Sequence, residues 1–179
     1  MLQGFAMTHR LTTFLSFAIA LLLCAPSWSM DNEPDGWGKA PWGTPAESFV
    51  KSDKTLRKTI KLSQVRKTLQ SQDVILNTPS ELDGTEVDAQ WFFGKQGLHT
   101  VHLRWQDRRP EAYDAWKKFL DRLESQWGPG KTVAEGEIVW QGKYTHVRAR
   151  KSVAPTGSAV EIQLTRVKSG DKPGASPAR

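Results

Sequence analysis

The middle of the chain alternates apolar and polar residues, a pattern that predicts an antiparallel β-sheet with one covered face. Successive side chains of a strand point to opposite faces, so an apolar residue at every second position marks a buried face. Residues 86–93 and 100–106 follow this pattern, and residues 94–97 between them predict a hairpin loop. The apolar positions of this hairpin are Val87, Ala89, Trp91, Phe93, Val101, Leu103 and Trp105.

Shorter segments of the same character predict further strands. Residues 74–76 form a short apolar run ahead of the turn signal Asp83-Gly84. Three more strands are expected in the C-terminal part, at 138–141, 146–150 and 160–165.

Two amphipathic segments predict helices. The clearer one places aromatic residues and leucines at spacings of three and four, which gives a single apolar stripe, and Gly128-Pro129-Gly130 ends it. This stripe consists of Tyr113, Trp116, Leu120, Leu123 and Trp127. The other helix is expected over 44–62, with Thr44 and Glu47 as a capping box and Ser52-Asp53 as a candidate break.

The order helix, three strands, helix, three strands predicts an α+β two-layer sandwich, αβββ–αβββ. We expect one antiparallel sheet of about six strands with two helices on one face, because the apolar strand faces need cover. This single domain is expected over 44–168, with 44–107 and 108–168 as its tandem halves. Residues 30–43 are expected to form a lead-in linker, and the Gly-, Pro- and Ser-rich residues 169–179 a disordered tail.

The first 29 residues have the features of a secretory signal peptide. Arg10 supplies a basic start, residues 11–23 form an apolar run too short to span a bilayer, and Ser27-Trp28-Ser29 offers small residues for cleavage. Cleavage there predicts a periplasmic or secreted protein without a transmembrane anchor. A lipid anchor on Cys24 is not expected, because Leu23 stands where a lipoprotein signal needs a small residue.

Removal of the expected signal peptide changes the charge and the cysteine content of the chain that folds. The sequence has 25 Lys and Arg residues against 19 Asp and Glu, a net charge of +6, and only Arg10 lies in residues 1–29, so the mature net charge is +5. The single cysteine, Cys24, leaves with the signal, which excludes a disulfide scaffold and thiol chemistry. A basic chain favours acidic partners, and an exported one is not expected to meet nucleic acid.

Two motifs carry a resemblance to known proteins. Trp42-Gly43-Thr44-Pro45 ahead of a helix resembles the Trp-Gly-x-Ser/Thr start of many small exported bacterial proteins. Their hairpin motif Phe-x-x-Gly-x-Leu-x-x-Val-x-Leu is similar here, with one spacing shifted, at Phe93, Gly94, Gly97, Leu98, Val101 and Leu103.

The tandem arrangement also resembles the β-lactamase-inhibitor-protein group and the small outer-membrane-assembly lipoproteins, over about residues 42–167. The chain departs from them because it lacks a lipidated cysteine and the disulfides of the inhibitor group. The resemblance implies an exported, non-catalytic binding module.

Common catalytic and cofactor motifs are missing from the sequence. It contains neither a Gly-x-Ser-x-Gly elbow nor a Gly-x-x-x-x-Gly-Lys phosphate loop, and no cofactor is expected. By parity, His99 falls on the covered face and His102 on the other, so the two cannot share a metal ion on a regular strand. Zinc bound by His102 and His146 with a carboxylate stays an alternative.

Two groups of residues are candidate binding surfaces. The first lies on the uncovered sheet face and consists of Phe92, His102, Arg104, His146, Arg148 and Arg150. It is either a solvated face with cross-strand ion pairs or a recognition surface with Phe92 as aromatic anchor. The second recurs at helical spacing and consists of Lys51, Lys54, Lys58 and Lys61. It is either a solvated helix face or an anion-binding stripe.

These observations favour a non-catalytic binding or accessory protein of the bacterial cell envelope. It would recognise another envelope protein, acidic if electrostatics matter, through the open sheet face or an edge strand, for instance as an inhibitor or immunity protein. One alternative is a basic module that binds anionic envelope polymers. Another is a hydrolase in which His102 or His146 acts as a general base beside Glu161.

Overall fold

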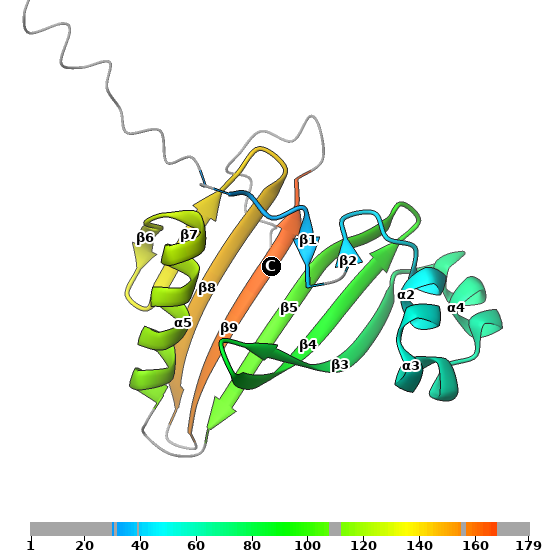
Figure 1. Ribbon diagram of the computed structural model, residues 1–179, viewed down its shortest axis with the longest axis horizontal. Helices are drawn as coiled ribbons and strands as arrows, with labels where there is room; N and C mark the ends of the chain where they lie inside the picture. The colour runs from blue at the N-terminus through cyan, green and yellow to red at the C-terminus, as the bar shows by residue number, and fades with distance from the viewer. Residues whose placement is uncertain (1–29, 31, 39, 108–111, 155–156, 168–179) are drawn as a thin grey trace, which may run out of the picture.

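Seven strands form one antiparallel sheet, in the order β3-β4-β5-β9-β8-β7-β6 (Figure 1). The strands are β3 (Val74–Leu82), β4 (Thr85–Gly94), β5 (Gly97–Asp107), β6 (Lys131–Ala134), β7 (Glu137–Gln141), β8 (Thr145–Ala154) and β9 (Gly157–Arg166). The computed structural model describes residues 30, 32–38, 40–107, 112–154 and 157–167. The expected signal peptide (1–29) and tail (169–179) lie outside the described residues.

The sheet consists of two meanders that meet at their last strands. β3, β4 and β5 are consecutive neighbours, β7, β8 and β9 are likewise, and β5 pairs with β9. The prediction of an α+β protein built on a large antiparallel sheet is confirmed, but the count of six strands is wrong. The additional strand, β6, pairs only with β7, and all four of its residues are exposed, so no buried face marks it in the sequence.

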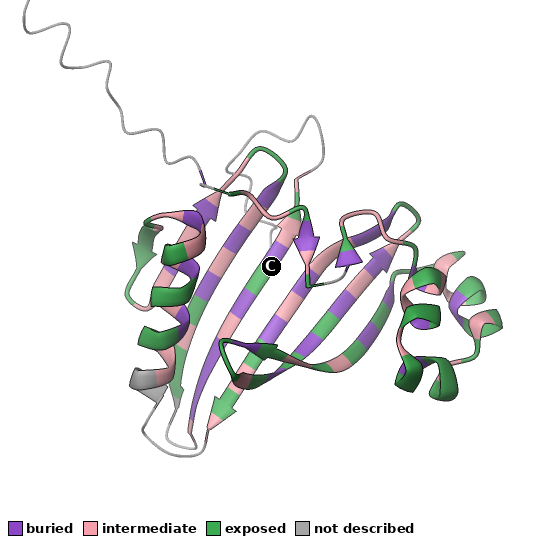
Figure 2. Cartoon of the chain, viewed as in Figure 1, coloured by how far each residue is buried: buried purple, intermediate pink, exposed green. Residues whose placement is uncertain are grey.

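One face of the sheet is buried and the other is not, as Figure 2 shows by the banding of each strand. The register aligns core residues in rows that cross the sheet. One such row runs through Leu76, Trp91, Val101, Leu164, Val147 and Trp140, which are at most 6% exposed. The alternation read from the sequence therefore identified the covered face of these strands.

Helix α5 (Ala112–Trp127) covers the half of the sheet formed by β7, β8 and β9 (Figure 1). It ends before Gly128, as predicted. Phe119 is 1% exposed and its ring centroid lies 6.2 Å from that of Trp105, while the Trp127 ring lies 6.0 Å from Trp140. The predicted stripe omitted Phe119, because a helix on a wide sheet buries a face broader than one row of residues.

Three short helices replace the single helix expected over 44–62. They are α2 (Ala46–Ser52), α3 (Lys54–Thr59) and α4 (Leu62–Leu69), and they form a helical layer at the β3 end of the sheet (Figure 1). Asp53 makes the break, because its carboxylate accepts hydrogen bonds from the backbone N–H groups of Thr55 (2.8 Å) and Leu56 (2.9 Å) and so begins α3. In the described part of the chain, no helix combines the length and apolar character needed to cross a bilayer.

The start of α2 differs from the predicted capping box. Pro45 occupies the N-cap without a side-chain cap hydrogen bond. The hydroxyl of Thr44 instead donates to the Pro41 carbonyl at 2.7 Å. α2 is held by packing: the Phe49 ring lies 4.7 Å from Trp91 and 5.3 Å from Phe93.

Residues 32–38 and 40–44, here called the N-terminal strap, connect the two halves of the sheet. The strap contains the two-stranded ribbon β1 (Gly36–Trp37) and β2 (Ala40–Pro41). At one end, the Glu33 carboxylate accepts hydrogen bonds from the backbone N–H groups of Lys143, Tyr144 and Thr145 in the β7–β8 turn. The Trp42 indole N–H donates to the Thr145 hydroxyl at 2.9 Å.

At its other end the strap pairs with the β4–β5 hairpin. The Gly43 N–H donates to the Leu98 carbonyl (2.9 Å), and the Leu98 N–H donates to the Thr44 carbonyl (2.8 Å). This contact has no room for a side chain at Gly97, whose added Cβ would lie 2.1 Å from the Gly43 carbonyl oxygen. The two motifs that carry the resemblance therefore contact each other.

Gly97→Ala is expected to destabilise the protein by about 2–4 kcal/mol, because it combines a positive φ of +86° with the clash against the strap. Gly84→Ala is the matched control. Gly84 also has a positive φ, +71°, but nothing lies within 4 Å of an added Cβ, so its cost is about 1–2 kcal/mol. Urea unfolding of the two variants measures the difference, and equal losses would show that the strap contact does not constrain the hairpin.

Candidate functional site

All six residues of the first candidate surface lie on the uncovered sheet face, as the register shows. One row across this face alternates in charge from strand to strand. It runs through Asp88, Arg104, Glu161, Arg150 and Glu137. Arg148 occupies the next row of β8.

The arginines of this face are compensated by carboxylates. Arg104 Nε lies 3.5 Å from Glu161 Oε1, and Arg148 Nη2 lies 2.8 Å from Glu137 Oε1. Arg150 sits between the partners Glu137 and Glu161 in the register. Opposite charges on neighbouring strands stabilise the sheet by modest amounts and leave little net field for an acidic partner.

The two histidines occupy the less charged part of the same face. His102 lies between Gln90 and Gln163, and His146 lies beside Thr165. β9 separates their strands, and their partners Gln163 and Thr165 are two residues apart on β9, so the two histidines are about 12 Å apart at the backbone. Within the described ranges, no group of three or more His, Cys, Asp or Glu side chains is arranged to hold a metal ion.

Burial shifts both imidazoles toward the neutral form. It lowers the pKa of His102 below the ordinary value of 6.5, and the Arg104 charge adds to this while Glu161 opposes it. Burial also lowers the pKa of His146, with a contribution of the same sign from Arg148. Both histidines are therefore shifted toward the form that carries no charge near neutral pH.

The helical layer α2–α4 has a different charge balance. Residues 46–69 contain seven Lys and Arg residues and two Asp and Glu, a net charge of +5. Residues 30–179 hold 24 basic and 19 acidic residues, so outside this layer seventeen of each remain and their charges cancel. The whole net charge of the expected mature chain is thus located in 24 residues.

The basic side chains of this layer are all exposed, namely Lys51, Lys54, Arg57, Lys58, Lys61, Arg66 and Lys67. One of them is held in a two-point ion pair: Arg66 donates to the two Glu47 oxygens at 2.7 and 2.8 Å, which lowers the pKa of Glu47. The four predicted lysines do not form a stripe on one helix, because Asp53 and Lys61 are boundaries between helices. The four lysines are spread over α2, α3 and the N-cap of α4. The layer also contains three cations outside the predicted set, Arg57, Arg66 and Lys67.

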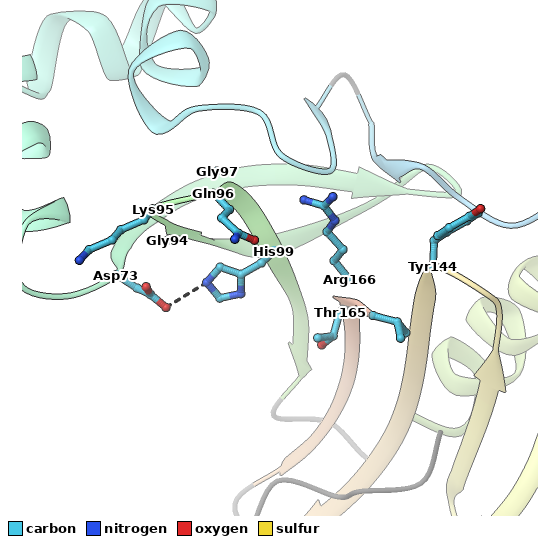
Figure 3. A pocket seen from close by; sticks show the side chains of 10 residues that line it. Asp73, Gly94, Lys95, Gln96, Gly97, His99, Tyr144, Thr165 and Arg166 are labelled. Carbon is cyan, nitrogen blue, oxygen red and sulfur yellow. Dashed lines mark hydrogen bonds and ion pairs between the residues drawn. The ribbon is translucent and has the colours of Figure 1, made fainter. Parts of the chain in front are cut away.

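A groove lies between the β4–β5 hairpin and the ends of β8 and β9 (Figure 3). Its volume is ≈ 880 Å³, and its polar side chains include Asp73, Lys95, Gln96, His99, Tyr144 and Arg166. His99 Nε2 lies 2.9 Å from Asp73 Oδ2, and Nδ1 lies 3.0 Å from the Thr100 hydroxyl. Both ring nitrogens are therefore engaged within the protein.

The prediction that His99 lies on the covered face is wrong, and a β-bulge is the reason. Phe92 pairs with Thr100 but Phe93 pairs with Leu98, so His99 is an extra residue on β5. Leu98 takes the core position and is fully buried, while His99 moves into the groove. The shifted spacing of the hairpin motif, with apolar residues at both Leu98 and Val101, was the sequence signal for this bulge.

No protein-family model, curated protein or solved structure matches this chain. The fold and the arrangement of its residues therefore carry the functional argument.

His102→Gln and His146→Gln, singly and combined, are expected to reduce the loss of stability in acid. The folded state favours neutral imidazoles, so the unfolded chain binds protons more readily, and the wild type loses stability as pH falls from above 6.5 through the lowered pKa values. Urea unfolding at about pH 7.5 and about pH 5 measures this loss. Asn77→Ala, an exposed change on β3, should keep the wild-type difference; an unchanged difference in the histidine double variant would contradict the assignment.

Proposed function

We propose that this protein is a non-catalytic binding protein that holds an anionic polymer on its helical layer α2–α4. The observation that supports this most directly is the location of the net charge. Residues 46–69 carry +5, and the rest of the expected mature chain is neutral. A neutral body with one basic surface has a directional field that orients a polyanion toward that surface.

The basic side chains of the layer are available to a ligand. All seven are exposed, and Glu47 and Asp53 are the only acidic residues among them. Asp53 is engaged in capping α3, and Glu47 is engaged with Arg66. A polymer with regularly spaced negative charges would contact several of the remaining cations at once and release its counterions, which favours binding.

The open sheet face is the weaker candidate for an acidic partner. Its arginines alternate with carboxylates and two of them form ion pairs with these. A protein that recognises this face would need to match alternating charges and the corner where exposed Ile75 pairs with Phe92. The experiment below distinguishes such a protein partner from a polyanion.

The predicted signal peptide suggests the source of the polymer. An exported basic protein meets phosphate-rich chains and anionic lipid head groups in the cell envelope, and not nucleic acid. We therefore propose an envelope polymer that bears phosphate or carboxylate groups as the ligand class.

Lys54→Gln, Lys58→Gln and Lys61→Gln combined are expected to weaken binding of long-chain polyphosphate by about tenfold or more, since three exposed contacts are lost at about 0.5–1 kcal/mol each. The dependence of the logarithm of the binding constant on the logarithm of the salt concentration should become shallower, by about 0.7 for each contact removed. Fluorescence titration over a series of salt concentrations measures both quantities.

The matched control removes the same charge from the sheet face, as Arg104→Gln, Arg148→Gln and Arg150→Gln combined. It should change polyphosphate affinity by less than about twofold, because Arg104 and Arg148 form ion pairs and Arg150 lies opposite Glu137 and Glu161 in the register. Equal effects of the two triple variants would contradict a localised site. Retention of an envelope protein through high salt, lost only with the sheet variant, would replace this proposal with recognition by the open face.

A further inference from the structure

The groove beside the β4–β5 hairpin has cationic and hydrogen-bonding groups that the fold does not use. Figure 3 shows Arg166 reaching from the end of β9 toward the hairpin, with Gln96 on the facing side and Lys95 beyond it on the side of Asp73. At ≈ 880 Å³ the groove has the size of a small-molecule site.

The charges of the groove are unequally engaged. Asp73 contributes a carboxylate, and it lies in contact with His99, which is itself held by Thr100. Within the part of the chain that the structure describes, neither Arg166 nor Lys95 lies within ion-pair distance of a carboxylate. The groove is therefore lined by two cations that form no ion pair with a described carboxylate, and Lys95 extends away from Arg166 on the side of Asp73 (Figure 3).

Arg166 is exposed, and its guanidinium lies beside the strap at the wall of the groove. A Cβ placed on Gly43 would lie 3.4 Å from Arg166 Nη1, so the strap packs beside it. The strap, in turn, is hydrogen-bonded to the hairpin that carries Lys95 and Gln96. The strap therefore lies next to Arg166 on one side and is hydrogen-bonded to the hairpin on the other.

We propose that this groove binds a phosphate or carboxylate group, with Arg166 as its principal contact. A guanidinium offers two parallel N–H donors that match two oxygens of such a group, and Lys95 adds charge on the hairpin. For the source of the group the inference rests on the proposed function, since a polymer held on α2–α4 could place one of its units here. A small free anion is the other source.

The position of the groove next to the helical layer supports a unit of a bound polymer as the source of the phosphate or carboxylate group. Asp73 ends the short connection from α4 to β3 and the strap leads into α2, so both ends of the layer adjoin the groove. Lys95 points to the same side as Asp73 (Figure 3). A bound chain could therefore extend from the exposed cations of the layer to Arg166 without crossing the neutral sheet face.

Titration of the full mature chain with inorganic phosphate, followed by NMR, tests the groove itself. Amide signals of Gln96, Gly97 and Arg166 are expected to shift. Arg166→Gln should weaken this binding by about tenfold, the loss expected for one charged hydrogen-bonding partner, and Arg166→Lys by less. Lys131→Gln, which removes an exposed cation from β6 at the far edge, should leave it unchanged.

The two proposals fail in different ways. Absence of shifts at the groove, or shifts confined to α2–α4, would overturn the groove site even if polyphosphate still binds the helical layer. If phosphate shifts the groove but polyphosphate affinity does not respond to the Lys54, Lys58 and Lys61 changes, the groove site stands and the polymer function fails. An additional loss of polyphosphate affinity in Arg166→Gln, beyond that of Lys131→Gln, identifies the polymer as the source.

Discussion

The antiparallel pairing of β5 with β9 is the interaction on which the rest of the structure depends. Eight residue pairs, from Thr100 with Thr165 to Asp107 with Ser158, join two meanders that are otherwise local in sequence. Because the period of a strand is two residues, this one register decides which side chains of both meanders share a face. It aligns Val101 with Leu164 in the core and, on the other face, Arg104 with Glu161. A shift by one residue would bury the charges and expose the core, so the pairing is strongly specified.

The N-terminal strap stabilises the same junction from the covered side. Glu33 and Trp42 attach it to the start of β8, and Gly43 and Thr44 attach it to the β4–β5 hairpin. The N-terminal strap and the end of β9, which are far apart in the sequence, thus come together beside the groove, where Arg166 packs against Gly43. The bulge at His99 turns one side chain of β5 out of the core and into this groove, toward Asp73.

Charge is distributed according to the secondary structure. The sheet face places acidic and basic residues on alternating strands, which lets them pair and keeps the surface close to neutral. The helical layer has no such partners apart from Glu47 and the capping Asp53, and its excess of lysines and arginines stays uncompensated. This separation is why we place the proposed polyanion site on α2–α4 and not on the sheet face.

The sequence by itself determined the fold class, the covered face of most strands and helix α5, because alternation and helical spacing are local consequences of burying one side of an element. It also determined which residues share the open face, since parity alone assigns them. Only the tertiary structure decided β6, the division of the first helix, the bulge at His99 and the pairing of Arg148 with Glu137. None of these features follows a regular alternation or helical spacing: Asp53 caps a new helix through partners two and three residues away, β6 buries no face, the bulge adds one residue to a hairpin, and the ion pair needs the register of two strands. Ser52-Asp53 and the shifted spacing around Leu98 signalled two of them in the sequence, but only the structure showed their form. The groove belongs to this second group, because the strap, the hairpin and the end of β9 meet only once the sheet has formed.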